Sequence, residues 1–186
     1  FIVFEDANIE SAVNGSVAGI FGAAGQSCVA GSRLYLHEDI ADEFLERMIE
    51  VAKGIKIGDP LLEETQMGPL CTIGQLENIE KEVSHAIEEG GQVLHGGKRP
   101  DDMDGLFYEP TIISCKNQNM KIVDTELFGP VLSVLKFKTE EEVIGLANDT
   151  VHGLAAGIFT KDSARSLRMA KAVRAGIVWV NTYRVV

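Results

Sequence analysis

The chain has 186 residues and a formal net charge of −11, with 45% hydrophobic and 24% charged residues. This length is sufficient for one domain with a sizeable core, and the composition is typical of globular proteins. The acidic balance argues against nucleic acid and anionic membranes as partners. No apolar run approaches the length of a membrane span. We therefore expect neither a nucleic-acid partner nor a membrane partner.

Short apolar strands alternate with amphipathic helices along the whole chain. The predicted strands are residues 1–4, 33–37, 92–95, 108–115, 131–137, 154–159 and 177–180, and the predicted helices are 8–21, 39–52, 76–87, 139–148 and 162–173. Asp6 or Asn8 can cap the first helix, and Thr139 with Glu142 has the spacing of a capping box. This order predicts an α/β domain with a largely parallel sheet covered by helices on both faces.

The segment between the first predicted helix and the strand 33–37 is rich in glycine. Gly22, Gly25 and Gly31 allow a positive φ and a close approach of the backbone to a ligand. On such a turn, the sulfur and the backbone N–H of Cys28 can face the same cavity. Covalent catalysis on a carbonyl needs this arrangement of a thiolate and an oxyanion donor. The alternative is a tight helix-to-strand connection with a cysteine that plays no part in chemistry.

The other cysteines and the histidines carry less information. Cys28, Cys71 and Cys115 are odd in number and widely spaced, which indicates free thiols in a reducing compartment and hence a cytoplasmic location. The four histidines have no metal-ligand spacing to one another or to the cysteines. We predict no metal site.

Three sequence blocks resemble those of one enzyme family. Residues 21–33, FGAAGQSCVAGSR, resemble the active-site cysteine signature of the NAD(P)-dependent aldehyde dehydrogenases. Residues 126–130, ELFGP, resemble that family's cofactor-ribose motif, and residues 176–181, GIVWVN, resemble its late core strand. Their order and separations fit the family, and the resemblance covers essentially every residue.

The resemblance assigns roles to individual residues. It implies that Cys28 attacks a small-molecule aldehyde and forms first a thiohemiacetal and then a thioester, with NAD or NADP as cofactor. Glu126 would accept hydrogen bonds from the nicotinamide ribose, with Phe128 packed beside it. Gln75 falls near a position that contacts the adenosine side of the cofactor in some members. The substrate side would include Gln26, Ser27 and Asn181.

Each of these residues also has a simpler structural interpretation. Glu126 can be a turn-forming acid, Phe128 a core anchor and Gln75 an exposed helix glutamine. Asn181 can be a polar residue that closes a strand.

The resemblance also implies that parts of the family's enzyme lie outside this sequence. The dinucleotide-binding domain, the general-base glutamate and an asparagine oxyanion donor precede the cysteine in the family. Residues 1–186 are therefore expected to be a catalytic domain truncated at both ends, inactive alone, from a homodimer or homotetramer. Two alternatives stay open: a thiol acyltransferase or hydrolase that pairs Cys28 with a histidine, and a non-catalytic folding or oligomerisation domain.

Overall fold

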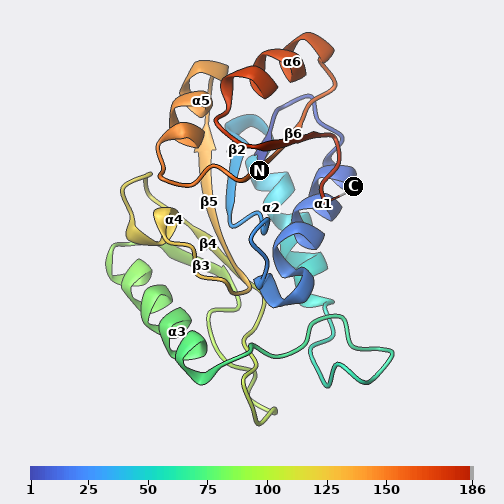
Figure 1. The fold of residues 1–186 in the computed structure, drawn as a ribbon, viewed down its shortest axis with the longest axis vertical. Helices are drawn as coiled ribbons and strands as arrows, with labels where there is room; N and C mark the ends of the chain where they lie inside the picture. Colours follow the sequence, from blue (N-terminus) through green and yellow to red (C-terminus); the bar gives the residue numbers. More distant parts are fainter. Residues whose placement is uncertain (185–186) are drawn as a thin grey trace.

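A computed structural model describes residues 1–184 as a seven-stranded sheet with helices around it (Figure 1). The strands are β1 (Ile2–Val3), β2 (Arg33–His37), β3 (Gln92–His95), β4 (Thr111–Ser114), β5 (Val131–Phe137), β6 (Ala155–Phe159) and β7 (Ile177–Val180). They lie in the order β3-β4-β5-β2-β1-β6-β7. Neighbouring strands are parallel, except that β3 and β4 are antiparallel. The predicted α/β class with a largely parallel sheet is confirmed.

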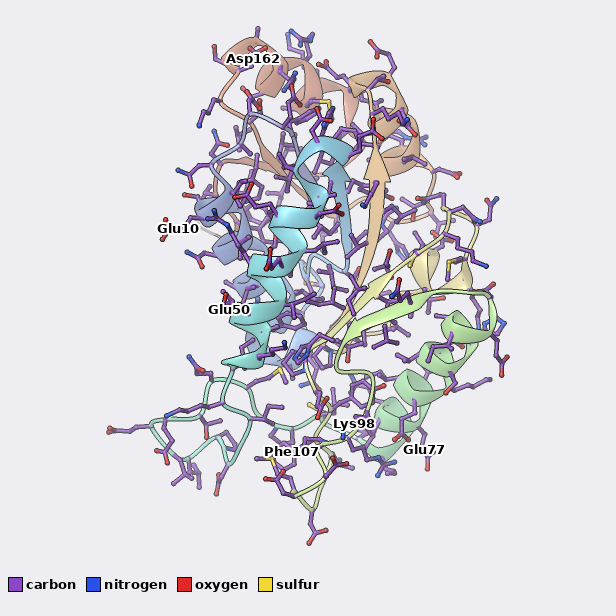
Figure 2. The ribbon with its side chains drawn as sticks, turned by 180° about the vertical axis from the view of Figure 1, so that it is seen from behind. Glu10, Glu50, Glu77, Lys98, Phe107 and Asp162 are labelled. Atoms are coloured by element: carbon purple, nitrogen blue, oxygen red, sulfur yellow. The ribbon has the colours of Figure 1, made fainter. Side chains whose placement is uncertain are left out.

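Helices cover both faces of the sheet, and α2 lies in front of it in Figure 2. The helices are α1 (Ile9–Phe21), the 3₁₀ turn η1 (Gly22–Gly25), α2 (Glu38–Lys53), α3 (Ile73–Glu88), α4 (Lys121–Asp124), α5 (Glu140–Asn148) and α6 (Ser163–Ala172). Their outer faces carry acidic side chains, among them Glu10, Glu50 and Glu77 (Figure 2). Among residues 1–184, no helix is long and apolar enough to cross a membrane.

Side-chain caps decide where the helices begin. Asn8 caps α1 by accepting a hydrogen bond from the Ser11 N–H at 3.0 Å. Of the two predicted caps, Asp6 and Asn8, Asn8 is therefore the one that is used. Thr72 caps α3 in the same way, so that this helix begins three residues before its predicted start. Thr139 caps α5, as predicted.

The core runs through the middle of the sheet. The two residues of β1 are almost fully buried because this strand lies between β2 and β6. Val131–Phe137 forms β5, where Lys136 alone is exposed, as expected for a strand covered on both faces. The rings of Phe4 and Phe137 pack edge to face with their centroids 5.3 Å apart. This packing fills the core at the carboxyl ends of β1 and β5.

Candidate active site

The nucleophile loop, defined here as residues 22–31, connects α1 to β2 and has an unusual backbone. Ala23, Ala24 and Gly25 are successive left-handed residues, with φ of 54°, 52° and 71°. A left-handed conformation costs a residue with a side chain about 1–2 kcal/mol, so contacts elsewhere must hold this loop in shape. Gly31 is needed for a different reason, because a Cβ there would lie 1.8 Å from the Phe1 ring.

Cys28 lies on a tight turn that opens onto a cavity. The turn is closed by the Ala30 N–H, which donates to the Ser27 carbonyl at 2.9 Å, so the Cys28 N–H is not used in closing it. Cys28 is exposed and lines a cavity of about 330 Å³. Ser27 lines the same cavity, and its hydroxyl oxygen accepts a hydrogen bond from Arg184 at 3.1 Å. The thiol thus lies at a place that a small molecule can reach.

The cofactor turn, defined here as residues 125–130, precedes β5 and lines the same cavity. Glu126 is exposed, and Phe128 is 41% exposed with a left-handed φ of 54°. An aromatic residue in this conformation is strained, and such strain is typical of functional turns. The carboxylate and the aromatic ring are therefore available to a ligand.

The parallel sheet brings the two segments together. Arg33 of β2 is in register with Ser133 of β5, so the segments that precede these strands meet at one edge. This is the amino edge of the strands, whereas ligands in open α/β sheets usually bind at the carboxyl edge. The backbones also touch: a Cβ on Gly25 would lie 2.0 Å from the Gly129 carbonyl oxygen. Cys28 and Glu126 therefore line one cavity.

The other three predicted site residues are not among those that line the cavity, and their side chains bind the backbone. The Gln26 amide bonds Pro69 and Cys71, and Gln75 donates to the Phe128 carbonyl. The Asn181 amide accepts from the Thr160 N–H at 3.0 Å and donates to the Thr160 carbonyl at 2.9 Å. Their substrate and cofactor contacts stay predictions.

Tyr183 is a cavity residue that sequence reasoning did not assign to the site. Its hydroxyl donates to the carbonyl of Val29 at 2.9 Å, directly beside the cysteine. Burial raises the pKa of this phenol to about 12, so it stays protonated and keeps donating. No sequence motif marks this tyrosine as a site residue. Its position two residues after Asn181 was the one feature that could have suggested it.

Of the four histidines, His152 lines the cavity together with Cys28. Its Nε2 lies 3.1 Å from the Asp124 carbonyl oxygen, which can only accept. That nitrogen therefore carries a proton in this arrangement and is not free to accept one from Cys28. Among the described residues, no group of three or more His, Cys, Asp or Glu side chains could hold a metal ion.

Comparison with known proteins identifies the family. The family profile described as "Aldehyde dehydrogenase family" matches residues 1–186. The chain is 51% identical to a (Z)-2-((N-methylformamido)methylene)-5-hydroxybutyrolactone dehydrogenase of Acinetobacter baylyi, over 100% of this chain and 38% of the relative. It is 47% identical to the betaine aldehyde dehydrogenase of Bacillus subtilis, over 98% of this chain and 38% of the relative.

Solved structures agree. The crystal structure of PnpE in complex with nicotinamide adenine dinucleotide superposes with a TM-score of 0.97 at 48% identity. That match covers 100% of this chain and 38% of the PnpE chain. The chain thus spans little more than a third of the length of these relatives. It belongs to the aldehyde dehydrogenase family.

Proposed function

We propose that this chain is the cysteine-bearing part of an enzyme that oxidises an aldehyde to a carboxylic acid with NAD or NADP. The observation that carries the proposal is the cavity shared by exposed Cys28 and the cofactor turn with Glu126 and Phe128. The names of the relatives support it, because several are betaine aldehyde or aminoaldehyde dehydrogenases.

The proposed chemistry begins at the sulfur of Cys28. Its thiolate forms a C–S bond with the aldehyde carbon, and the resulting oxyanion accepts a hydrogen bond from the Cys28 N–H. Departure of hydride from that carbon restores the carbonyl and leaves a thioester on Cys28. NAD or NADP, when bound, supplies the acceptor for this hydride. Water then cleaves the C–S bond, which releases the acid and regenerates the thiol.

The cofactor turn has groups that suit a nicotinamide ribose. A carboxylate accepts hydrogen bonds from both hydroxyls of a vicinal diol, and Glu126 is exposed at the cavity wall. The half-exposed ring of Phe128 offers an apolar surface beside it. The crystal structure of PnpE in complex with nicotinamide adenine dinucleotide supports NAD as the cofactor.

The cysteine assignment has a parallel among the relatives. A betaine aldehyde dehydrogenase of Staphylococcus aureus, 41% identical to this chain, was solved with a BME-modified cysteine. A cysteine of that relative is therefore open to a small thiol reagent, as we propose for Cys28.

Location and assembly stay predictions. We propose a cytoplasmic enzyme that is a homodimer or homotetramer, although some relatives are named peroxisomal or chloroplastic. The isolated 186 residues are proposed to be inactive.

Two substitutions test the proposal in the complete enzyme that carries this chain. Cys28→Ala should abolish NAD(P)H formation. Cys71→Ala, at another exposed cysteine, should leave it unchanged, because Cys71 contacts Gln26 through its backbone N–H, which alanine keeps. Glu126→Gln keeps the size but removes a charge-assisted hydrogen bond, worth about 1.5–3 kcal/mol. NAD(P)H formation should slow accordingly, by about 10- to 150-fold.

Acylation by p-nitrophenyl acetate separates the two halves of the site. The Glu126→Gln enzyme should still be acylated at Cys28 at the wild-type rate, because the exposed Glu126 side chain takes no part in this step and its replacement leaves the backbone of the cofactor turn unchanged. Unchanged dehydrogenase kinetics in this variant would remove Glu126 from the site. Ester hydrolysis that is lost on replacing His152 would favour the thiol hydrolase instead.

A further inference from the structure

A short segment of chain contacts both halves of the proposed site. We define residues 69–75 as the linking segment; it ends in the first turn of α3. It meets the nucleophile loop through the side chain of Gln26 and the cofactor turn through the side chain of Gln75. Both side chains were predicted to contact small molecules, but their polar atoms bind the backbone.

Gln26 uses both ends of its amide within this arrangement. Its nitrogen donates to the carbonyl oxygens of Ala23 and Pro69, each at 3.2 Å. Its oxygen accepts from the Cys71 N–H at 2.9 Å. The first bond spans the left-handed residues of the nucleophile loop, and the other two fasten that loop to the linking segment. Cys28 lies two residues further along.

Gln75 performs the matching task on the cofactor side. Thr72 and Gln75 have the spacing of a capping box, in which the glutamine side chain would return to the Thr72 N–H. The Thr72 hydroxyl does accept from the Gln75 N–H at 3.2 Å, but the side-chain amide of Gln75 donates instead to the Phe128 carbonyl. Phe128 is the left-handed residue of the cofactor turn. The bond therefore restrains the strained residue of this turn.

The nucleophile loop and the cofactor turn also contact each other directly. The backbone of Gly25 packs against that of Gly129 so closely that a Cβ on Gly25 would overlap the Gly129 carbonyl. Gly129 in turn packs on Ile79 of α3, with no room for a Cβ. The nucleophile loop, the linking segment and the cofactor turn thus support one another, and a shift of one displaces the others.

We propose that Gln26 and Gln75 are positioning residues that hold Cys28 against the cofactor turn through the linking segment. The inference rests on the proposed function, in which Cys28 is the nucleophile and the cofactor turn binds NAD or NADP. It has a specific consequence: a change at Gln75 alters the reactivity of Cys28 even when no cofactor is present. A residue that acted solely as a cofactor contact would have no such effect.

The test uses Gln26→Met and Gln75→Met in the complete enzyme, because methionine keeps the side-chain length and removes the amide. The matched control is Gln66→Met, since the Gln66 side chain also accepts a backbone bond, from the Lys56 N–H at 2.9 Å, and is not among the residues that line the cavity. The readouts are kcat and the rate of Cys28 alkylation by iodoacetamide without NAD or NADP, followed by peptide mass. Thermal unfolding shows whether each variant is folded.

Both test variants should change the cofactor-free alkylation rate at least threefold and lower kcat by about tenfold or more, since small misplacements of reacting groups are costly. The control should stay within about twofold of the wild type, because no site contact is lost. If a methionine variant does not fold, Gln26→Glu and Gln75→Glu replace it, because each keeps the size and loses the donated bonds.

Two results would overturn the inference. One is a Gln75 variant that raises the KM for the cofactor but leaves the cofactor-free alkylation of Cys28 unchanged, which would make Gln75 a cofactor contact alone. The other is that Gln26→Met and Gln75→Met both have the same kcat and the same rate of Cys28 alkylation as the control Gln66→Met. Dehydrogenase activity that survives Cys28→Ala would instead overturn the proposed function, so the two failures are distinguishable.

Discussion

Cys28 and Cys115 differ in environment. Cys28 lies exposed on the nucleophile loop, whereas Cys115 follows the buried strand β4 and is partly buried. Burial raises the pKa of the Cys115 thiol to about 11. At pH 8 such a thiol is ionised to only about one part in a thousand, and the thiolate is the form that reacts.

We therefore predict that brief treatment with iodoacetamide at pH 8 labels Cys28 well before Cys115. Peptide mapping by mass spectrometry measures both sites in the same sample. Raising the pH toward 11 should increase the labelling of Cys115, because its thiolate then becomes populated. Preferential labelling of Cys115 at pH 8 would contradict the assignment of the exposed thiol.

The role of a residue could be predicted where its neighbours in the sequence indicated it. It could not be predicted where a contact with a distant residue determines the role. The setting of Cys28 was visible in its Gly-rich neighbours. The partners of Gln26 lie 43 and 45 residues away, so the sequence could not show that its amide fastens a loop. Asn181 has a left-handed φ of 54° and binds the backbone of Thr160, again a tertiary contact.

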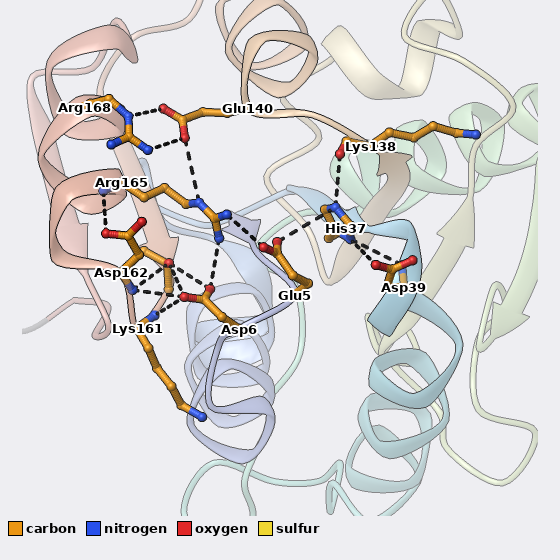
Figure 3. A network of polar contacts seen from close by, with 11 residues as sticks. Glu5, Asp6, His37, Asp39, Lys138, Glu140, Lys161, Asp162, Arg165 and Arg168 are labelled. Atoms are coloured by element: carbon orange, nitrogen blue, oxygen red, sulfur yellow. Dashed lines mark hydrogen bonds and ion pairs between the residues drawn. The ribbon is translucent and has the colours of Figure 1, made fainter.

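At the scale of elements, α5 and α6 are joined by a cluster of charged side chains (Figure 3). Glu140, at the start of α5, accepts two hydrogen bonds of 2.8 Å from the Arg168 guanidinium of α6. The neighbouring Arg165 lies between Glu5 at 2.8 Å and Asp6 at 3.2 Å. The hydrogen bonds from Arg168 lower the pKa of Glu140 below its ordinary value of 4.5.

This lowered pKa predicts an acid-dependent loss of stability. A carboxylate whose pKa is lower in the folded state stabilises that state above the unfolded pKa, and the contribution disappears as the pH falls through the folded pKa. Since Arg168 is half exposed, solvent screens the pair and its contribution to stability should be small. Glu140→Gln should therefore be less stable than the wild type at pH 7, and the difference should shrink below pH 4.5.

Urea unfolding at pH 7 and pH 3 measures this difference. Glu64→Gln, at an exposed loop position, serves as the control and should match the wild type at both pH values. An equal loss of stability in Glu140→Gln at pH 7 and pH 3 would show that the ion pair is not responsible.

The predicted bounds agree best with the structure for strands whose apolar run ends at a glycine, proline or polar residue. Strands 33–37, 92–95, 131–137 and 177–180 have the predicted bounds. Helix starts were less accurate, because α2 begins directly after β2 with His37 as its cap. The predicted strand 108–115 shortens to Thr111–Ser114, consistent with Pro110, which cannot donate to a ladder. The short helices η1 and α4 carry too few residues for a periodic pattern.

For the molecule as a whole, the parallel α/β class could be predicted, but the order of the strands could not. The two-residue strand β1 lies between β2 and β6, which are far apart in the chain. The antiparallel position of β3 was not visible either. The site lies at the amino edge of the sheet, where general topology would not have placed it. The resemblance to the family is what indicated this candidate site.

The chain spans only part of the length of its relatives, and this leads to a prediction for the 186 residues by themselves. They span about 38% of the length of their relatives. In the family, as the resemblance implies, the site that holds the dinucleotide pyrophosphate and the general base lies outside this span. A pyrophosphate site at a helix N-terminus normally anchors such a cofactor. Glu126 alone cannot replace it, so NAD should bind more weakly than about millimolar, above about −4 kcal/mol.

The isolated chain should therefore fold but form no NADH from a panel of aldehydes, as measured by absorbance at 340 nm. Circular dichroism provides the control for folding. NADH formation by the isolated chain that is lost in a Cys28→Ala variant would show that the segment carries its own base and cofactor site.

The central claim is that the sulfur of Cys28 carries the acyl group during aldehyde oxidation, and trapping that group tests it most directly. The complete enzyme is mixed with aldehyde and NAD or NADP, quenched in acid within the first turnover, digested and analysed by mass spectrometry. We predict that the peptide containing Cys28 gains the mass of the acyl group, and that the adduct is absent without cofactor. Two results would contradict the account. One is an acyl adduct on another residue. The other is full NAD(P)H formation while Cys28 stays unmodified at every quench time and can be replaced by alanine.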